Sequence, residues 1–143
     1  MDKSYQLSAE VPAAADYLRL RRVTGLSPKS AEGAARGLPN SIFGVVVRKD
    51  DAVIGMGRLV GDGGLMFQVT DIAVDPQHQG KGIGKAIVAR IVRHIGETVP
   101  DGAYVSLIAD GEAHRLYSQF GFAPTAPASI GMELHVRPLQ RTA

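Results

Sequence analysis

The feature that most constrains the fold is a glycine-rich segment, Asp75–Val88, which joins a strand pattern to a helix pattern. It reads DPQHQGKGIGKAIV. Isoleucine then recurs at positions 83, 87, 91 and 95, so we predict a helix from about Gly82 to Glu97 with one apolar stripe. The run Leu65–Val74 before it is rich in strand-forming residues and stops at a proline. The segment therefore predicts a strand, a tight turn and a helix in succession.

The rest of the chain supplies further strands and helices around this unit. We expect helices over Ala13–Arg22, from Ser27 to about Arg36, and from Asp110 to Gly121. We expect the other strands at Ile42–Arg48, Ala52–Val60, Tyr104–Ala109 and Ile130–Val136, with a hairpin turn at Asp50 and Asp51. This order predicts a mixed α/β fold built on one sheet, and 143 residues fit one domain, residues 1–143.

Composition excludes several classes of protein. The chain has no cysteine, so it cannot use disulfides, a cysteine nucleophile or thiolate metal ligands. Its net charge of +2 is too small to indicate a nucleic-acid partner. No apolar run reaches the length of a membrane span, and the first residues do not read as a signal peptide. We expect a cytoplasmic protein with no membrane partner and, because its four histidines are scattered, no metal.

A glycine-rich turn at a helix start can bind an anion, because the first-turn N–H groups are unpaired and glycine has no Cβ to block them. Three phosphate motifs compete for this stretch. A P-loop requires a hydroxyl after its lysine, and here Lys81 precedes Gly82. A dinucleotide fingerprint requires glycine at position 85, which is Lys85. From spacing alone, a flexible turn before a surface helix remains an equal alternative.

The third motif is the acyl-CoA signature V-x-P-x-x-Q/R-x-x-G-x-G/A, matched by Val74, Pro76, Gln79, Gly82 and Gly84. A second motif, A-x-x-L-Y-x-x-x-G-F, is matched by Ala113, Leu116, Tyr117, Gly121 and Phe122. With both motifs in this order, the chain resembles the GNAT superfamily of N-acetyltransferases over about Phe67–Phe122, and the element order extends the resemblance over the whole chain. The stretch LIADGEAHRLYSQFGF is most similar to the plant and cyanobacterial serotonin N-acetyltransferase branch.

The resemblance implies a GNAT-like fold, with a mostly antiparallel mixed sheet flanked by helices, that binds acetyl-CoA. The residues implied to bind it are Ile72, Ala73, Val74, Gln79, Gly80, Lys81, Gly82, Ile83, Gly84, Lys85 and Tyr117. The strand end at Ile72–Val74 would bind the pantetheine arm through its backbone. The turn from Gln79 to Lys85 would surround the pyrophosphate.

Two residues are implied to be catalytic. Tyr117 matches the family tyrosine that often protonates the departing thiolate, although its place on an apolar stripe also fits a core residue. Asp110 stands where related enzymes use an aspartate or asparagine, and it would assist deprotonation of the amine. Aspartate before a helix is also an ordinary N-cap, so a structural role is equally compatible with its position.

The acceptor site is carried over from the fold rather than read from the residues. The resemblance implies that the first two helices shape it, which brings in Leu26, Ser27 and Phe43. Asp71 would share a strand face with Val69 and Ala73. It would orient substrate or simply hydrogen-bond inside the sheet, or less often act as a base. Arg19, Arg21 and Arg22 form a basic helix end that fits a solvated face better than a contact with an acidic substrate.

These features favour an acetyl-CoA-dependent N-acetyltransferase that acts on a small-molecule primary amine, arylalkylamine or polyamine-like, by direct attack in a ternary complex. A protein N-terminus or a lysine is the alternative acceptor. The other alternative is that the chain catalyses no reaction and is an acyl-CoA-binding sensor. A homodimer is possible, although no residue marks an interface.

Overall fold

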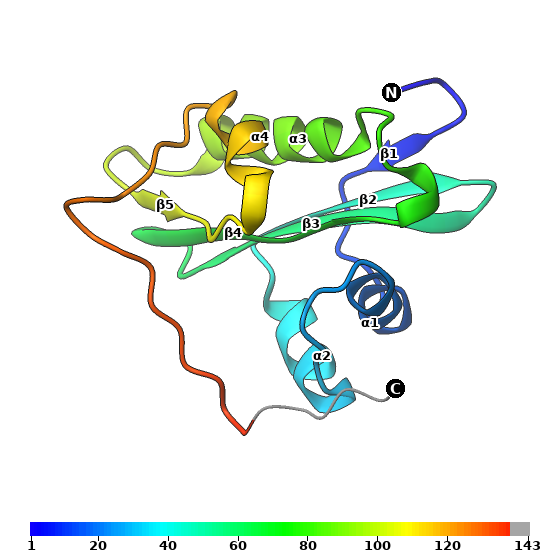
Figure 1. The fold of residues 1–143 in the computed structure, drawn as a ribbon, viewed down its shortest axis with the longest axis horizontal. Helices are drawn as coiled ribbons and strands as arrows, with labels where there is room; N and C mark the ends of the chain where they lie inside the picture. The colour runs from blue at the N-terminus through cyan, green and yellow to red at the C-terminus, as the bar shows by residue number, and fades with distance from the viewer. Residues whose placement is uncertain (138–143) are drawn as a thin grey trace.

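A five-stranded sheet in the order β1-β2-β3-β4-β5 forms the centre of the molecule (Figure 1). The computed structural model describes residues 1–137. The strands are β1 (Gln6–Ser8), β2 (Phe43–Lys49), β3 (Ala52–Gly61), β4 (Met66–Val74) and β5 (Tyr104–Ser106). The first four pair antiparallel, and β4 pairs with β5 in parallel. The predicted mixed, mostly antiparallel sheet is therefore confirmed.

Helices cover both faces of this sheet (Figure 1). On one face lie α1 (Ala14–Val23) and α2 (Ala31–Gly37), and on the other lie α3 (Ile83–Thr98) and α4 (His114–Ser118). Short 3-10 turns, η1 (Leu38–Asn40), η2 (Pro76–His78) and η3 (Gly111–Ala113), complete the described elements. No helix within residues 1–137 combines the length and the apolar character that crossing a bilayer requires.

Strand β2 shows why two helical layers form. Val45, Val46 and Val47 are all fully buried, although neighbouring side chains of a strand point to opposite faces. Val45 and Val47 pack in the core under α3, whereas Val46 packs in the core under α1 and α2. An uninterrupted apolar run is typical of a strand that is covered on both sides.

Helix α3 packs closely on β3 because that strand has glycine beneath the isoleucine stripe. A Cβ on Gly57 would lie 2.7 Å from Ile87 Cγ2 and 2.7 Å from Ile72 Cδ1, closer than real contacts allow. Ile83, Ile87 and Ile91 are buried, as the four-residue spacing predicted. The helix that begins at the glycine-rich turn is therefore fixed firmly to the sheet.

A β-bulge interrupts β4 at Asp71 and changes which face its side chains occupy. The pairing with β3 shifts between Met56 and Arg58, and Asp71 has a φ of 60°. Before the bulge, Val69 packs in the core under α3; after it, Ala73 packs in the core under α1 and α2. The prediction that Val69, Asp71 and Ala73 share one face is therefore wrong, because the extra residue shifts the alternation.

Strands β4 and β5 separate soon after they meet. They pair only over Met66–Gln68 and Tyr104–Ser106. Strand β4 continues to Val74, so its residues 69–74 have no β5 partner. The predicted strand Tyr104–Ala109 is shorter than expected for the same reason, because residues 107–109 leave the sheet.

Helix α2 begins later than predicted. Ser27 does not cap it, because both its backbone oxygen and its hydroxyl accept hydrogen bonds from Arg21. Ser30 is the N-cap instead, and its hydroxyl accepts a hydrogen bond from Gly33 N at 2.9 Å. The helix expected from Asp110 is also irregular, and it divides into η3 and the short α4.

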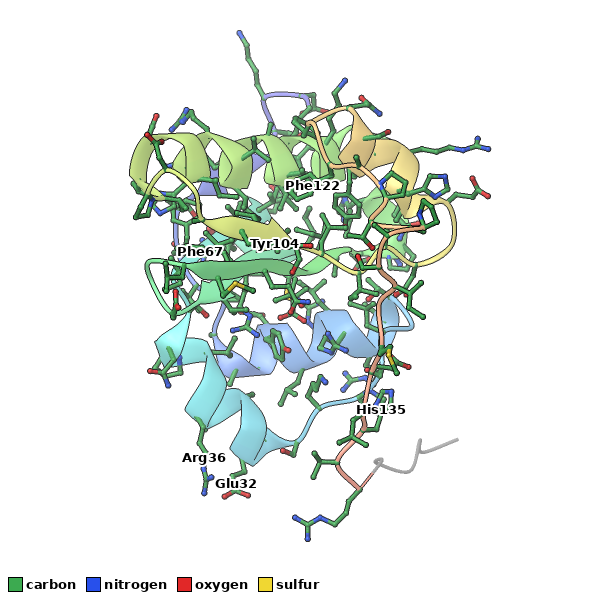
Figure 2. All side chains as sticks on the ribbon, turned by 90° about the vertical axis from the view of Figure 1, so that its left-hand side faces the viewer. Glu32, Arg36, Phe67, Tyr104, Phe122 and His135 are labelled. Carbon is green, nitrogen blue, oxygen red and sulfur yellow. The ribbon has the colours of Figure 1, made fainter. Side chains whose placement is uncertain are left out.

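The predicted final strand, Ile130–Val136, is not a strand in the structure. This segment is extended but pairs with no other part of residues 1–137, and its apolar side chains are exposed. Figure 1 shows the chain after α4 passing the β5 side of the sheet and then running on in extended form, and Figure 2 marks this last part by His135. The alternating sequence pattern is that of a strand, but no strand partner lies along its course.

Candidate active site

The turn from Asp75 to Gly82 is built by local hydrogen bonds. Asp75 Oδ1 accepts from Gln77 N at 2.9 Å, and Gln79 Nε2 donates to Val74 O at 3.0 Å. Gly80 and Gly82 have φ values of 77° and 80°, a region in which side chains are disfavoured, and Gly82 is the N-cap of α3. The glycines therefore let the chain turn sharply from β4 into α3.

This turn leaves a series of backbone donors unpaired. Within residues 1–137, no N–H group from Gly80 to Lys85 donates to another protein group; the next, Ala86 N, donates to Gly82 O at 3.1 Å. Lys81 and Lys85 are exposed beside these donors. Successive free N–H groups, lysines and the positive end of a 16-residue helix are together suited to bind a phosphate-type anion.

The unpaired edge of β4 adjoins this anion site. Residues 69–74 have no β5 partner, and the predicted pantetheine contacts Ile72, Ala73 and Val74 lie on that edge. An extended amide chain can bind such an edge as an added strand does. The predicted contacts for the pantetheine arm and the pyrophosphate of acetyl-CoA are therefore continuous along the chain.

Tyr117 and Asp110 lie near one another after β5. Tyr117 is half-buried on α4, with its ring edge-on to Phe122 at a centroid separation of 6.2 Å. Burial raises the pKa of the Tyr117 hydroxyl, and the negative charge of Asp110 raises this pKa further. Tyr117 therefore keeps its hydroxyl proton, as a group that donates a proton must.

Asp110 is exposed, and its side chain is not used as a cap. It occupies the N-cap position of η3, but no side-chain cap hydrogen bond forms. Asp110 therefore stands at the position that an N-cap residue takes, but its side chain does not make the hydrogen bond of a cap. The carboxylate is left available to accept a proton.

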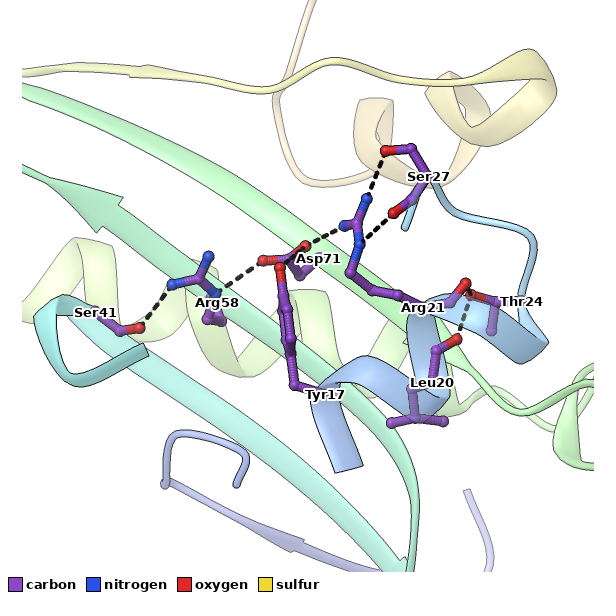
Figure 3. Close-up of polar contacts among 8 residues, drawn as sticks. All are labelled: Tyr17, Leu20, Arg21, Thr24, Ser27, Ser41, Arg58 and Asp71. Atoms are coloured by element: carbon purple, nitrogen blue, oxygen red, sulfur yellow. Dashed lines mark hydrogen bonds and ion pairs between the residues drawn. The ribbon is translucent and has the colours of Figure 1, made fainter. Parts of the chain in front are cut away.

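Asp71 is not a free carboxylate. It is buried beside the bulge, and it accepts hydrogen bonds from Tyr17 Oη at 3.2 Å, from Arg58 Nε at 2.8 Å and from Arg21 Nη1 (Figure 3). Its charge is therefore compensated by two guanidinium groups. Both of its oxygens already accept hydrogen bonds, so any contact with a substrate would pass through the arginines or Tyr17.

The predicted acceptor residues are not all brought together. Ser27 binds Arg21, and Leu26 packs against the core under α1 and α2. Phe43 lies on the opposite face of the sheet, where it stacks on His94 at 3.9 Å between centroids. The expectation that Phe43 lines the same pocket therefore has to be corrected; the strand alternation of β2 turns it toward α3.

The arginines of α1 differ in role. Arg19 Nη2 donates to Val53 O at 2.6 Å, which ties α1 to β3, and Arg22 is exposed. Arg21 is buried against Asp71. The basic helix end is therefore partly a core feature rather than a uniformly solvated face.

Three residues of this site were not predicted from the sequence. Tyr17, Lys29 and Arg58 line an open cavity of about 200 Å³ between the first two helices and β3. Arg58 carried a signal, since a charged residue within the apolar run of β3 needs a buried partner. Among the described residues, no three histidines or carboxylates gather as a metal site would require.

The description "Acetyltransferase (GNAT) domain" belongs to the family model that matches residues 40–124, which include the glycine turn, the β4 edge and Tyr117. The chain belongs to the GNAT acetyltransferase family. A solved structure from methicillin-resistant Staphylococcus aureus, a protein of unknown function named a probable acetyltransferase, is 44% identical; the match covers 92% of this chain and 99% of that one, with a TM-score of 0.88. A GNAT family protein from Streptococcus pneumoniae is 25% identical over 93% of this chain and 98% of that one, with a TM-score of 0.74.

Plant proteins are among the curated relatives of this GNAT chain, as the predicted resemblance to a plant branch implied. An Arabidopsis thaliana protein named GCN5-related N-acetyltransferase 2, chloroplastic, is 33% identical over 59% of this chain and 32% of its own length. A Glycine max protein named histone acetyltransferase TAP1 is 31% identical over 56% of this chain and 34% of its own length. The chain spans about a third of the length of these curated relatives.

The glycine turn yields a direct prediction. Gly82→Ala is expected to weaken acetyl-CoA binding about 10-fold, because a side chain at a φ of 80° moves the backbone and misaligns N–H donors worth roughly 1.5–3 kcal/mol each toward a charged group. Gly102→Ala is the matched control, since Gly102 has a φ of 84° and lies in the turn before β5, and a Cβ there would meet no close contact, as at Gly82, where the nearest atom is Met1 N at 3.6 Å. Calorimetric titration with acetyl-CoA measures both. Equal affinities for the two variants would rule out the turn as the phosphate site.

Proposed function

We propose that this GNAT chain transfers the acetyl group of acetyl-CoA to a primary amine of a small molecule, by direct attack in a ternary complex. The observation that carries the proposal is the row of unpaired N–H groups from Gly80 to Lys85 beside the unpaired edge of β4. These two features fit the pyrophosphate and the amide-containing arm of one donor molecule.

The reaction requires two proton transfers. The amine nitrogen attacks the thioester carbonyl carbon; a C–N bond forms, the C–S bond breaks, and the sulfur leaves as a thiolate. Tyr117 gives its hydroxyl proton to that thiolate, and the exposed carboxylate of Asp110, directly or through water, takes the proton that the amine loses. Asp71 takes no part as a base, because its two oxygens are held by Arg21 and Arg58.

A protein N-terminus or a lysine is the second candidate acceptor. The name of the Glycine max relative, histone acetyltransferase TAP1, favours it. The size of the cavity favours the small molecule, because about 200 Å³ between the first two helices and β3 holds a compact acceptor.

A panel of small amines and of lysine and N-terminal peptides decides between these acceptors. Release of CoA thiol is measured with a thiol reagent, and the chain has no cysteine of its own to contribute background. We expect turnover on small amines and little on peptides. The reverse preference would establish the second candidate, and tight acetyl-CoA binding without turnover on any amine would make the chain a non-catalytic sensor.

A further inference from the structure

The cavity beside Asp71 has a charge that constrains its ligand. It is lined by Tyr17, Lys29, Ser30, Gly33, Ala34, Gly37, Leu38 and Arg58. None of these residues is acidic, and two are basic. The carboxylate of Asp71 is not among the lining groups, and it accepts hydrogen bonds from the Tyr17 hydroxyl and the Arg58 guanidinium (Figure 3).

The positive charge on this wall exceeds the negative charge. Asp71 carries one carboxylate, whereas Arg21 and Arg58 carry two guanidinium groups. Each of the three nitrogens of Arg21 already has an acceptor, because they donate to Asp71 and to both oxygens of Ser27. The cavity therefore has an unbalanced positive charge even before Lys29 is counted.

Arg58 has donor capacity left over. Its Nε binds Asp71 and its Nη1 donates to Ser41 Oγ at 2.9 Å, while Nη2 has no acceptor among residues 1–137. Lys29 forms no ion pair within the same residues and is exposed at the cavity mouth. A guanidinium and an ammonium directed at one space are suited to a carboxylate or a phosphate group.

The cavity also lies next to the place where acetyl transfer is proposed. Tyr17 and Arg58 contact Asp71 directly, and Asp71 is followed in the bulge by Ile72, the first predicted contact of the donor arm. We propose that the acceptor carries an anionic group, carboxylate or phosphate, which Arg58 and Lys29 bind while its amine faces the β4 bulge. The inference rests on the proposed function and narrows its acceptor. A polyamine would place further positive charge against Arg58 and Lys29, and a plain arylalkylamine would leave Arg58 Nη2 and Lys29 without an acceptor atom.

Matched acceptor pairs test this inference. Tyrosine is compared with tyramine, and phosphoethanolamine with ethanolamine, with putrescine as the polyamine. We expect the anionic member of at least one pair to have a kcat/KM at least 10-fold higher than its neutral partner. The two pairs distinguish carboxylate from phosphate. Equal or better turnover of the neutral amines would overturn the inference and leave the acetyltransferase proposal intact.

Lys29→Met isolates the charge, because Lys29 is exposed and forms no ion pair within residues 1–137. We expect the preference for the anionic member to fall about 10-fold, through a higher KM for that member. The control is Arg93→Met, which removes an exposed positive charge from α3 on the other face of the sheet. Calorimetric binding of the same pairs in the presence of CoA is measured in parallel. If no amine is acetylated, the proposed function fails. The acceptor inference then fails as well if the anionic members bind no better than the neutral ones.

Discussion

Replacing Tyr117 by phenylalanine is expected to lower kcat about 100-fold, the lower end of the contribution of a positioned acid. The phenyl ring keeps the edge-on packing against Phe122, so the free energy of unfolding should change little. What is lost is the proton for the thiolate. Acetyl-CoA affinity should therefore stay close to that of the wild type while kcat falls.

The pH profile identifies the lost group. Because burial and Asp110 raise the pKa of Tyr117, the wild type should keep its acid below that raised pKa and lose activity as pH rises through it. Tyr117→Phe should remove this alkaline limb. A variant with full kcat across the pH range would show that the hydroxyl has no part in catalysis.

Asp110→Asn is expected to shift the alkaline limb of the pH profile rather than remove it. Removing the negative charge lowers the pKa of Tyr117, so the alkaline limb should move to lower pH, and kcat should fall because the proton acceptor is gone. A normal rate with an unmoved limb would leave Asp110 with only the position of a cap.

The sequence was sufficient to predict those helices and turns that are determined by residues close to one another along the chain. The isoleucine spacing placed α3, and the glycines and Pro76 marked the turn that precedes it. The two aspartates of the hairpin have φ values of 50° and 67° at positions 50 and 51, as a two-residue turn requires. These features depend on neighbouring residues, so the pattern was sufficient to predict them.

The arrangement of the acceptor cavity could not be predicted, because it depends on contacts between residues that are far apart in the sequence. The bulge at Asp71 reverses the alternation of β4, and nothing in the run LMFQVTDIAV marks it except the aspartate itself. The contacts of Asp71 with Tyr17 and Arg21 span 54 and 50 positions. Phe43 was assigned to this side through the fold family, but the alternation of β2 places it on the other face.

Asp71→Asn is expected to destabilise the protein by about 3 kcal/mol, because it leaves the buried guanidinium groups of Arg21 and Arg58 without their counter-charge. The side-chain exposures are 3% for Asp71 and 9% and 13% for the two arginines, so solvent compensates little. Asparagine tolerates the φ of 60° about as well as aspartate, so the backbone is not a second cause. Chemical denaturation measures the effect. Asp50→Asn is the matched control, since Asp50 has a φ of 50° but is exposed, and its change should stay within about 0.5 kcal/mol.

The same variant separates a structural role from a role in acceptor binding. If Asp71→Asn is destabilised but keeps its preference for anionic acceptors, the carboxylate serves to hold two arginines in the fold, and Arg58 remains directed at the cavity. If stability is unchanged and the preference for anionic acceptors shifts, the negative charge of Asp71 contributes to the electrostatic potential in the acceptor cavity. A loss of less than about 1 kcal/mol with an unchanged preference would contradict both, and would mean that water satisfies the arginines. The buried pairing of one carboxylate with two guanidinium groups predicts the first result, with Arg58 retaining the spare donor that an anionic acceptor requires.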